Sequence, residues 1–441
     1  MPIEGFSPRL ATSRTDGETT VARPIRPLPV IAADGIYAFR NRNILLLQGP
    51  VGPFFARLAQ DLRWAGANVH KVNFNGGDWL FYSRGATPYR GRVDAFPDFL
   101  ETLCRELRIE VVMLFGDCRP VHQGVRPVAE RLGLRVEVFE EGYIRPDYIT
   151  METHGVNGNS ALPRSPIFFL NTPAPTPAKT MTVGLSIWHA AMWAFIYYAV
   201  AVFLWGFYPH YHHHRPLHWF EGLRWVRGTW RKLFYRVKER GALERLTTGD
   251  APPFFLVPLQ VHNDAQVGVH SEFGGVKDFI AHVATSFARH APPESVLVLK
   301  HHPMDRPYSD YTGLLRRLGQ QLGIAGRIVY IHDQHLPTLL NHARGVITIN
   351  STTGISAIHH GCPTLALGDA IYRIEGMTAA VPLDEFWCAS EDAAVQRELY
   401  RRFRNHLIHR TQINGNFYRR LTIPGSLSGL NWARGEGEDH E

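Results

Sequence analysis

Short apolar runs alternate with helix-like segments through the first third of the chain. The apolar runs cover residues 44–47, 69–74, 109–115 and 135–139. The helix-like segments between them cover residues 54–65, 96–107 and 121–132. Strands separated by helices are typical of parallel βαβ units, so the pattern predicts a first Rossmann-like domain at residues 41–178.

A second alternation of the same kind follows in the last half of the chain. Its apolar runs cover residues 254–257, 295–299, 327–331, 345–349 and 364–367. One helix between them is marked by apolar residues at the spacing of a single buried face, namely Val276, Phe279, Ile280, Val283 and Phe287. The pattern predicts a second parallel sheet at residues 249–385, and therefore an α/β fold of two Rossmann-like domains facing a cleft.

The two ends of the chain differ from these domains. Residues 1–40 are rich in Pro, Thr, Arg and Ala and lack the basic and then apolar order of a secretory signal, so we expect a mobile tail. Residues 386–441 contain a polar, Arg-rich helical pattern at 391–409. We expect this helix to close the chain and to pack back across the first domain.

The segment between the domains, residues 179–248, combines an apolar part with a basic part. Residues 183–208 are rich in Trp and Phe and are about long enough to cross a bilayer. Residues 215–245 carry nine Lys or Arg against three Glu, with Leu223, Val226, Trp230, Leu233 and Val237 at helical spacing. We expect a helical insertion that associates with one leaflet of a membrane. A buried helical hairpin and a true span are the alternatives, and a single span would separate the two halves of any shared cleft.

The composition narrows the class of protein. The 441 residues are 45% hydrophobic and 20% charged, which is typical of a folded globular chain. Four cysteines lie scattered without CxxC spacing, which argues against a disulfide framework or a zinc knuckle and fits a reducing cytoplasm. The net charge of +7 fits anionic substrates, a membrane surface or nucleic acid. Since no nucleic-acid-binding motif accompanies it, we expect no nucleic-acid partner.

Polar residues that could bind a ligand or take part in catalysis follow several of the apolar runs. Residues 350–354, Asn-Ser-Thr-Thr-Gly, lie between a strand and a helix, where free backbone N–H groups and hydroxyls would cradle a phosphate. Ordinary capping of the helix is the alternative. His302, before Pro303 and near Lys300 and Arg306, would stabilise a leaving phosphate, although His before Pro is also common in structural turns.

Carboxylates follow other runs. Asp264, in the loop that contains Gln260, could act as a nucleophile on an anomeric carbon or simply cap a helix. Glu140 and Glu141 offer a base from the first domain, so the pattern suits a two-step glycosyl transfer across a cleft. The turn at residues 48–53 matches neither GxGxxG nor a P-loop, and we interpret it as an acceptor-side loop. The histidines at 210–214 lack partners of metal-site spacing, so we expect no metal.

With these motifs in view, the chain resembles the bacterial capsule polysaccharide biosynthesis and export family, of the KpsS/LipB β-Kdo transferase type. The resemblance spans most of residues 43–375, and its most specific pieces are residues 46–50, 73–78, 139–148, 260–264, 302–303 and 350–354. It implies a GT-B architecture and transfer of β-Kdo from CMP-Kdo, with retention, to a phosphatidylglycerol-type lipid. It also implies a place at the cytoplasmic face of the inner membrane, peripheral or monotopic, with capsule export machinery as a partner and no cofactor beyond the donor.

The resemblance assigns roles to individual residues. Glu141 corresponds to the acceptor-activating base, Asp264 to the candidate nucleophile and His302 to the group that meets the CMP phosphate. Donor-side residues are then Gln260, Lys300, Pro303, Asn350, Ser351, Thr352, Thr353 and Gly354. Acceptor-side residues are Gln48, Gly49, Glu140, Gly142 and Arg145. Two alternatives remain: a GT-B enzyme that uses another nucleotide sugar, and a non-catalytic capsule assembly or export factor.

Overall fold

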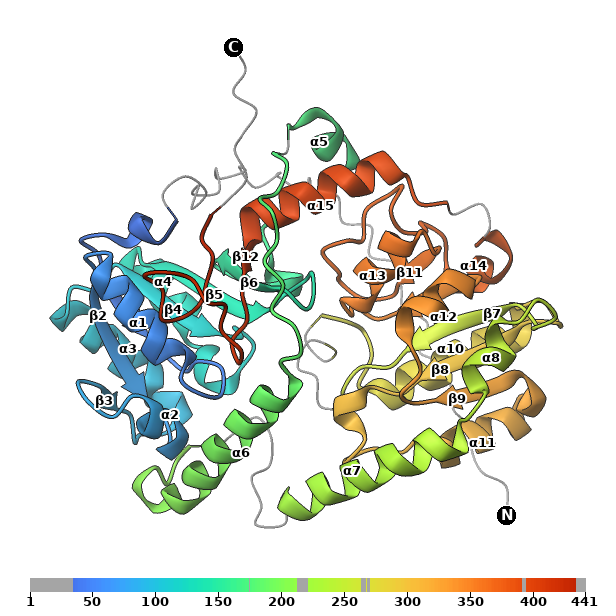
Figure 1. Cartoon of the computed structure of the whole chain (residues 1–441), viewed down its shortest axis with the longest axis horizontal. Helices are drawn as coiled ribbons and strands as arrows, with labels where there is room; N and C mark the ends of the chain where they lie inside the picture. The colour runs from blue at the N-terminus through green and yellow to red at the C-terminus, as the bar shows by residue number, and fades with distance from the viewer. Residues whose placement is uncertain are drawn as a thin grey trace, which may run out of the picture.

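The chain folds around two β-sheets, one in each lobe of the molecule (Figure 1). The computed structural model describes residues 35–173, 175–211, 221–262, 267, 270–390 and 394–433, with the backbone alone at 221–225. Short 3-10 helices occur at η1 Gly35–Phe39, η2 Val93–Ala95, η3 Pro120–His122, η4 Asn157–Asn159, η5 Trp205–Phe207, η6 Pro303–Asp305 and η7 Ala325–Arg327.

The first sheet contains the strands that the apolar runs predict, together with three more. Its strands are β1 Asn43–Leu46, β2 Asn68–Asn73, β3 Thr87–Pro88, β4 Val111–Phe115, β5 Arg135–Glu141, β6 Tyr148–Thr153 and β12 Gln412–Asn414, in the order β12-β6-β5-β4-β1-β2-β3. The covering helices are α1 Phe54–Trp64, α2 Gly76–Phe81, α3 Phe96–Glu106 and α4 Val125–Leu132. The central strands are apolar on both faces, as expected for strands covered by helices on each side.

The antiparallel edge of this sheet corrects the prediction of a purely parallel one. β6 runs antiparallel to β5, with Glu140 opposite Thr150 and Glu141 opposite Ile149. β12, from the far end of the chain, runs antiparallel to β6. Glu140 and Glu141 are therefore the last two residues of a strand and not loop residues, so their side chains point to opposite faces of the sheet.

The second sheet is entirely parallel and lies in the other lobe. Its strands are β7 Phe254–Pro258, β8 Val296–Lys300, β9 Ile328–Ile331, β10 Gly345–Thr348 and β11 Thr364–Ala366, in the order β11-β10-β7-β8-β9. The helices of this lobe are α8 Ala242–Thr247, α10 Val276–His290, α11 Thr312–Gln321, α12 Leu336–His342, α13 Thr353–His360 and α14 Leu383–Ala389. The predicted fold class, α/β with two Rossmann-like sheets in a GT-B-like arrangement, is thus confirmed, with the first sheet parallel except at its antiparallel edge.

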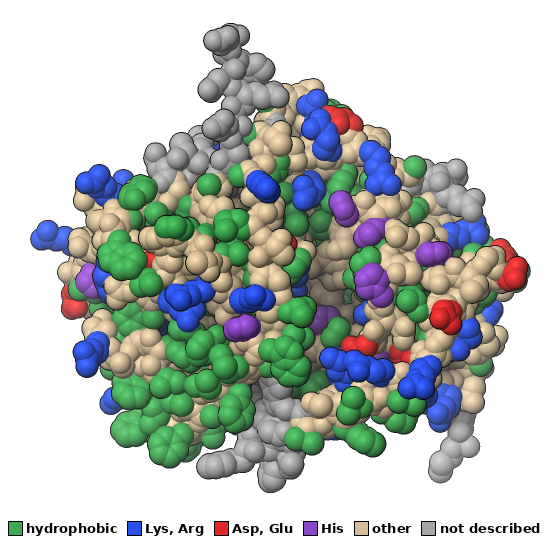
Figure 2. All heavy atoms as spheres, in the orientation of Figure 1, with side chains coloured by type: hydrophobic (Ala, Val, Ile, Leu, Met, Phe, Trp, Pro, Cys, Tyr) green, Lys and Arg blue, Asp and Glu red, His purple; other side chains and the backbone are tan. Residues whose placement is uncertain are grey.

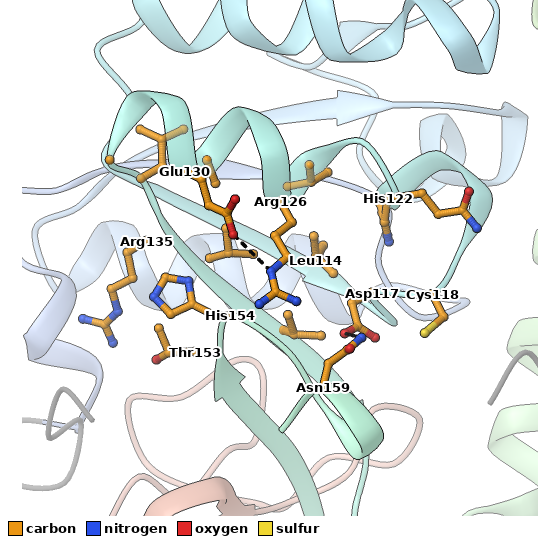
Figure 3. Close-up of a pocket in the computed structure, with 17 residues that line it drawn as sticks. Leu114, Asp117, Cys118, His122, Arg126, Glu130, Arg135, Thr153, His154 and Asn159 are labelled. Carbon is orange, nitrogen blue, oxygen red and sulfur yellow. Dashed lines mark hydrogen bonds and ion pairs between the residues drawn. The ribbon is translucent and has the colours of Figure 1, made fainter. Parts of the chain in front are cut away.

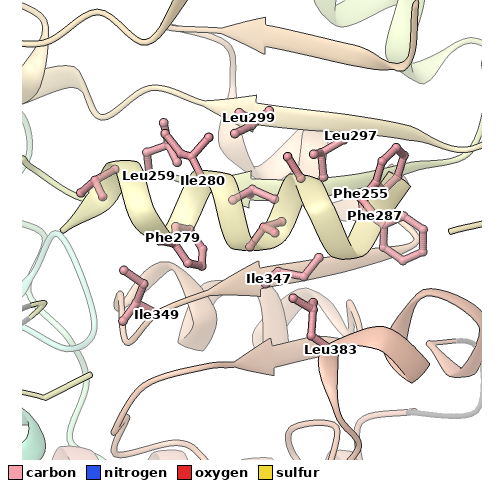
Figure 4. Packing of buried hydrophobic residues seen from close by; sticks show 14 of the residues in the cluster. Phe255, Leu259, Phe279, Ile280, Phe287, Leu297, Leu299, Ile347, Ile349 and Leu383 are labelled. Carbon is pink, nitrogen blue, oxygen red and sulfur yellow. The ribbon is translucent and has the colours of Figure 1, made fainter. Parts of the chain in front are cut away.

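The core of the second lobe shows why α10 is helical at its place in the sequence. Phe279, Ile280 and Phe287 project from one face of α10 toward apolar side chains of the sheet, among them Phe255 and Leu297 (Figure 4). All five residues of the predicted buried face are buried. The 3.6-residue spacing of these side chains therefore indicated the correct face.

The segment between the lobes forms two main helices, α6 Ile187–Phe203 and α7 Glu221–Lys238, after the short α5 Pro166–Asn171. α6 packs on α2 of the first lobe. α7 packs on the second lobe, where Arg231 donates hydrogen bonds to the carbonyls of Arg306 and Ser309. Trp188 and Phe203 of α6 are 77% and 83% exposed, so α6 is not a helix buried between the domains. Within the described parts of the chain, no helix combines the length and apolar character needed to cross a bilayer.

The C-terminal helix α15, Arg397–Thr411, passes from the second lobe to the first before β12 begins (Figure 1). One hydrophobic cluster combines residues of α15, such as Phe403 and Leu407, with Tyr143 and Phe169 of the first half and Ile355 of the second. The sequence predicted a closing helix at 391–409, of which 391–393 lie outside the described residues. The end of the chain thus joins the lobes and completes the first sheet.

Candidate functional site

The two lobes meet at the carboxyl ends of their sheets. Cys118, after β4, places Sγ 3.8 Å from Nε2 of His270, in the loop after β7. Arg164 forms an ion pair with Asp369, after β11, at 2.8 Å. The surface is hollowed between the lobes at this level (Figure 2). In open α/β sheets ligands bind outside the carboxyl ends of the strands, so this gap is the candidate site.

The first lobe contributes a carboxyl group that titrates near neutrality. Burial raises the pKa of Glu140 to about 7, with the neighbouring Glu141 and Asp117 adding to the rise and Arg119 opposing it. Oε1 of Glu140 accepts a hydrogen bond from its neighbour's backbone N–H at 3.0 Å. A carboxyl group with this pKa can take up or release a proton at physiological pH.

Glu141 occupies a different environment on the other face of the strand. Its Oε1 accepts a hydrogen bond from the hydroxyl of Tyr418 at 2.9 Å. The Glu141 carboxylate and burial together raise the pKa of Tyr418 well above its usual value, burial being the larger cause. Tyr418 therefore stays protonated and holds the carboxylate in place.

The turn after the glutamates is tightly packed. A Cβ on Gly142 would lie 2.0 Å from the carbonyl oxygen of Tyr148, so no other residue fits there. Arg145 is exposed and folds back, with Nε donating to the Gly142 carbonyl at 3.1 Å. The guanidinium group lies at the surface beside the turn.

The acceptor-side prediction for Gln48 and Gly49 leads to a buried polar network. Nε2 of Gln48 donates to the hydroxyl of Tyr211 at 2.8 Å, and its Oε1 accepts from Arg119 at 3.2 Å. Arg119 also donates to the carbonyl of Gly49 at 3.1 Å. Gln48 is only 1% exposed, so its side chain lies beneath the surface and links the β1 turn to Arg119.

On the second lobe, two predicted donor-side residues form a pair. Nε2 of Gln260 donates to Oδ1 of Asn350 at 3.0 Å, and the backbone N–H of Asn350 lies 3.4 Å from Oε1 of Gln260. Gln260 follows β7 and Asn350 follows β10, which are neighbouring strands. The structure therefore brings these two motifs together.

The hydroxyl-rich turn leads directly into helix α13, and the side chain at its N-cap position makes no capping hydrogen bond. Oγ of Ser351 accepts from the backbone N–H of Thr353 at 3.2 Å, and the N–H of Gly354 donates to the Ser351 carbonyl at 2.9 Å. The hydroxyl of Tyr372 donates to the same carbonyl at 2.6 Å, and a Cβ on Gly354 would lie 2.3 Å from that hydroxyl. Thr352 is the N-cap residue. The turn is thus fixed by internal bonds and by Tyr372.

His302 and its cationic neighbours lie at the end of β8. Nδ1 of His302 accepts a hydrogen bond from the backbone N–H of Met304 at 3.2 Å across Pro303, so a proton on the neutral ring resides on Nε2. Arg306 pairs with Asp333 at 3.2 Å. Burial lowers the pKa of Lys300, while Asp333 and Glu239 oppose that shift and Arg306 adds to it. The loop is rich in groups that could stabilise a phosphate.

A histidine and an aspartate that the sequence did not single out form a pair in this loop. Nδ1 of His262 lies 2.5 Å from Oδ1 of Asp305, and the Asp305 side chain is fully buried. His262 is two residues from Asp264, which itself lies outside the described residues. A signal was present in the sequence for His262, which lies in the motif at 260–264, whereas Asp305 lies two residues beyond the motif at 302–303.

A separate cavity of about 710 Å³ lies in the first lobe and contains none of the predicted site residues (Figure 3). Asp117 and Cys118 line one end of it, and Arg126, paired with Glu130 at 3.3 Å, lines another part. Among the described residues, no three His, Cys, Asp or Glu side chains are grouped so that they could hold a metal ion. Histidines 212–214 lie outside that part of the chain.

Comparison with known proteins establishes the family. Residues 110–418 match the family described as "Capsule polysaccharide biosynthesis protein". The chain belongs to this family. It is 43% identical over 386 residues to the Escherichia coli "Capsule polysaccharide export protein KpsS", covering 86% of this chain and 97% of that protein. It is 40% identical over 396 residues to a Neisseria meningitidis "Capsule polysaccharide modification protein LipB", covering 87% and 93%.

Solved structures show a more distant likeness. A chain described as "Thermosulfurimonas dismutans KpsC, beta Kdo 2,7 transferase" shares 14% sequence identity, with 86% of this chain and 94% of that chain covered and a TM-score of 0.39. The family resemblance drawn from the motifs is therefore confirmed by the sequence relatives, and the roles of individual residues remain predictions.

Proposed function

We propose that this capsule polysaccharide biosynthesis protein is a retaining glycosyltransferase that moves β-Kdo from CMP-Kdo to a phosphatidylglycerol-type lipid. Its product would begin the lipid linker of a capsule chain at the cytoplasmic face of the inner membrane, with capsule export machinery as the next partner. The observation that carries the proposal is the meeting of two sheets at their carboxyl ends, with Glu140 and Glu141 on one side and His302 on the other.

The charges of the second lobe suit an anionic donor. CMP-Kdo carries a phosphodiester and a sugar carboxylate, which the negative charge of an acidic site would repel. Lys300 and Arg306 lie at the end of β8 beside His302, and Arg145 lies exposed on the first lobe. Charge-assisted hydrogen bonds from such groups stabilise phosphate and carboxylate oxygens. We assign the donor to the second lobe and the acceptor to the first.

The reaction we propose is a double displacement. The carboxylate of Asp264 attacks the anomeric carbon of Kdo, and the bond to the CMP phosphate oxygen breaks as His302 stabilises the departing phosphate. An acceptor hydroxyl then attacks the same carbon, its proton passes to Glu141, and the bond to Asp264 breaks. Two inversions retain the β configuration.

The pKa of Glu140 supports a second assignment for the base. A carboxyl group with a pKa of about 7 is better matched to proton transfer near neutrality than an ordinary carboxylate. Glu140 and Glu141 are adjacent but point to opposite faces of the sheet, so only one of them can reach a given acceptor. Separate Gln variants distinguish them, since loss of the base lowers the transfer rate much more than loss of its neighbour.

The decisive experiment incubates the purified full-length chain with CMP-Kdo and phosphatidylglycerol vesicles. Mass spectrometry should detect a lipid heavier by one Kdo, together with released CMP. Release of UDP or GDP from other nucleotide sugars, without CMP release, would assign the chain to a different donor. Absence of product with every donor would refute an enzymatic role and leave a capsule assembly or export factor.

A further inference from the structure

Helix α6 is apolar around its whole circumference but is covered on one side only. It contains no Asp, Glu, Lys or Arg. Tyr197 and Ala201 are buried, and the approach to α2 is so close that a Cβ on Gly77 would lie 2.7 Å from the Tyr197 ring. Trp188 and Phe195 on other sides are 77% and 72% exposed. A helix that is apolar all round is normally enclosed by protein or lipid, whereas the other sides of α6 are left exposed by the part of the chain that the structure describes.

Helix α7 is amphipathic with its apolar stripe facing away from the protein. Val226, Trp230, Leu233 and Val237 follow helical spacing and are all exposed. Among the described positions of the helix, Gly228, Arg231 and Tyr235 are buried, and the charged Glu239 directly after the helix is buried too. This is the reverse of the arrangement in a surface helix of an isolated globular protein, where the apolar stripe faces the core.

The inner face of α7 is firmly bonded, so the helix cannot simply rotate to bury its stripe. Arg231 pairs with Asp310 at 2.8 Å, and Glu239 accepts from the ring of His332 at 2.6 Å. The ring of Tyr235 stacks on His332 with centroids 3.4 Å apart. Rotation of α7 would break all of these contacts.

Charge on the outer side of α7 has a single sign. Between residues 226 and 240 the exposed charged side chains are all cationic, namely Arg227, Lys232, Arg236, Lys238 and Arg240. Trp side chains beside a row of cations are typical of helices that lie in the headgroup region of anionic membranes. Two copies of the chain that met through this face would bring like charges together, which disfavours self-association.

The two helices lie on one side of the molecule although they belong to different lobes. Both follow the lower edge of Figure 1. In the same orientation, hydrophobic side chains gather over α6, and Lys, Arg and hydrophobic side chains lie over α7, below the hollow between the lobes (Figure 2).

We propose that the exposed faces of α6 and α7 form one docking surface for an anionic lipid bilayer, shared by both lobes. This docking surface rests on the proposed function in one respect, namely that the sugar acceptor is a membrane lipid. Docking through both helices would bring the hollow between the lobes close to the membrane surface. A lipid headgroup could then enter the site without leaving the bilayer.

The test is flotation of the full-length protein with vesicles, in the absence of donor. Vesicles of phosphatidylethanolamine and phosphatidylglycerol should carry the wild-type protein, and phosphatidylcholine vesicles should carry much less. The pairs Trp188→Glu with Phe195→Glu on α6, and Trp230→Glu with Leu233→Glu on α7, should each weaken binding roughly tenfold or more. The matched control is Ile167→Glu with Leu170→Glu on α5, where both residues are exposed at the opposite edge of Figure 1.

A charge variant gives an independent route if a Glu pair impairs folding. Lys232→Gln with Arg236→Gln changes exposed side chains only and should weaken binding to anionic vesicles by roughly tenfold at low salt, since each cation near an anionic surface adds to the attraction. Melting temperatures check that each variant is folded. Vesicle binding that is unchanged in the α6, α7 and charge variants would overturn the proposal. A wild-type protein that does not float but forms a dimer broken by the α6 substitutions would assign the surface to a second copy.

The outcome is separable from that of the proposed function. A chain that floats through α6 and α7 but transfers no Kdo refutes the transferase proposal and supports the docking surface. A chain that transfers Kdo to detergent-dispersed phosphatidylglycerol but does not float refutes the docking surface alone.

Discussion

The side-chain amides of Gln260 and Asn350 are hydrogen-bonded to each other at 3.0 Å, and through them the loops after β7 and β10 are tied together. Gln260 is buried and Asn350 is partly buried. The pair therefore fixes the separation of two loops that the proposed donor would contact. It does so with neutral groups, which add no charge to a site that already holds Lys300 and Arg306.

Replacement of Gln260 tests whether this pair organises a donor site. Gln260→Ala should lower the free energy of unfolding by about 1–3 kcal/mol, because the partly buried hydrogen bond between Gln260 and Asn350 is lost. It should also weaken binding of CMP, measured by isothermal titration calorimetry. Gln412→Ala is the control, since Gln412 is equally buried but bonds Thr150 in the first sheet. Equal loss of CMP affinity in both variants would show that Gln260 affects CMP binding only through the stability of the fold.

Two residues carry the proposed chemistry in the second lobe. Asp264→Ala should abolish transfer from CMP-Kdo, and His302→Ala should slow it by about 10²–10⁴-fold, the range of a lost acid–base or charge-stabilising group. Product formation is measured by mass spectrometry and folding by circular dichroism. His335→Ala serves as the control, because His335 is an exposed histidine bonded to Thr338 on α12. Wild-type turnover in Asp264→Ala would end its assignment as nucleophile.

The sequence predicted the apolar strands of both sheets well but missed the edge of the first. Residues 148–153 contain Thr150 and Glu152, which are buried but polar, so this strand does not read as an apolar run. β12 has three residues, two of them Gln412 and Asn414, and exists because β6 lies beside it. Short polar strands are determined by their partners, which the local pattern does not contain.

The site was predicted at the level of loops and not of side-chain pairs. That the motifs around Gln260 and Asn350 would meet follows from parallel strands ending at one edge. The pairing of His262 with Asp305 depends on side-chain directions in an irregular loop, which spacing does not encode. The stripe on α7 was equally visible in the sequence, and in the described part of the chain its residues Val226, Trp230, Leu233 and Val237 are exposed.

The contacts of Arg231 predict that α7 is held mainly by buried polar bonds. Arg231→Ala removes the hydrogen bonds that Arg231 donates to two backbone carbonyls and to Asp310, so we expect a loss of about 2–4 kcal/mol in the free energy of unfolding. The adjacent Lys232 is exposed, and Lys232→Ala should change stability by about 0.5 kcal/mol or less. Urea titration of both variants provides the comparison. A similar small effect in both would show that α7 depends on other contacts.

The close approach of α2 and α6 predicts a strict requirement for glycine. A Cβ on Gly77 would meet three atoms of the Tyr197 ring at 2.7–2.8 Å, so Gly77→Ala must displace α6 or the ring. We expect a destabilisation of about 1–3 kcal/mol, the usual range for overpacking. Gly206→Ala is the control, because no atom lies within 4 Å of a Cβ there. Thermal melting should separate the two variants, and equal melting temperatures would contradict the tight packing of α6.

The raised pKa of Glu140 predicts a specific pH dependence of stability. Burial raises this pKa to about 7 from an ordinary value of 4.5, so the folded chain favours the protonated form. The stabilisation that protonation provides is complete below pH 4.5 and is lost as the pH rises through 7. Glu140→Gln stays neutral throughout. It should therefore gain stability relative to the wild-type protein between these values, by at most about 1.4 kcal/mol per pH unit, and then level off.

Unfolding by urea at pH values from about 5 to about 9 measures this difference directly, both where it should grow and where it should level off. Glu398→Gln is the control, since hydrogen bonds from Arg401 and Arg402 hold the pKa of Glu398 at about 2. A carboxylate with so low a pKa is ionised throughout the tested range, so its replacement should give a difference that does not change with pH. A constant difference for Glu140→Gln as well, or one that grows as the pH falls, would show that Glu140 is ionised in the folded chain. It would also remove the support for Glu140 as the alternative to Glu141 as the base.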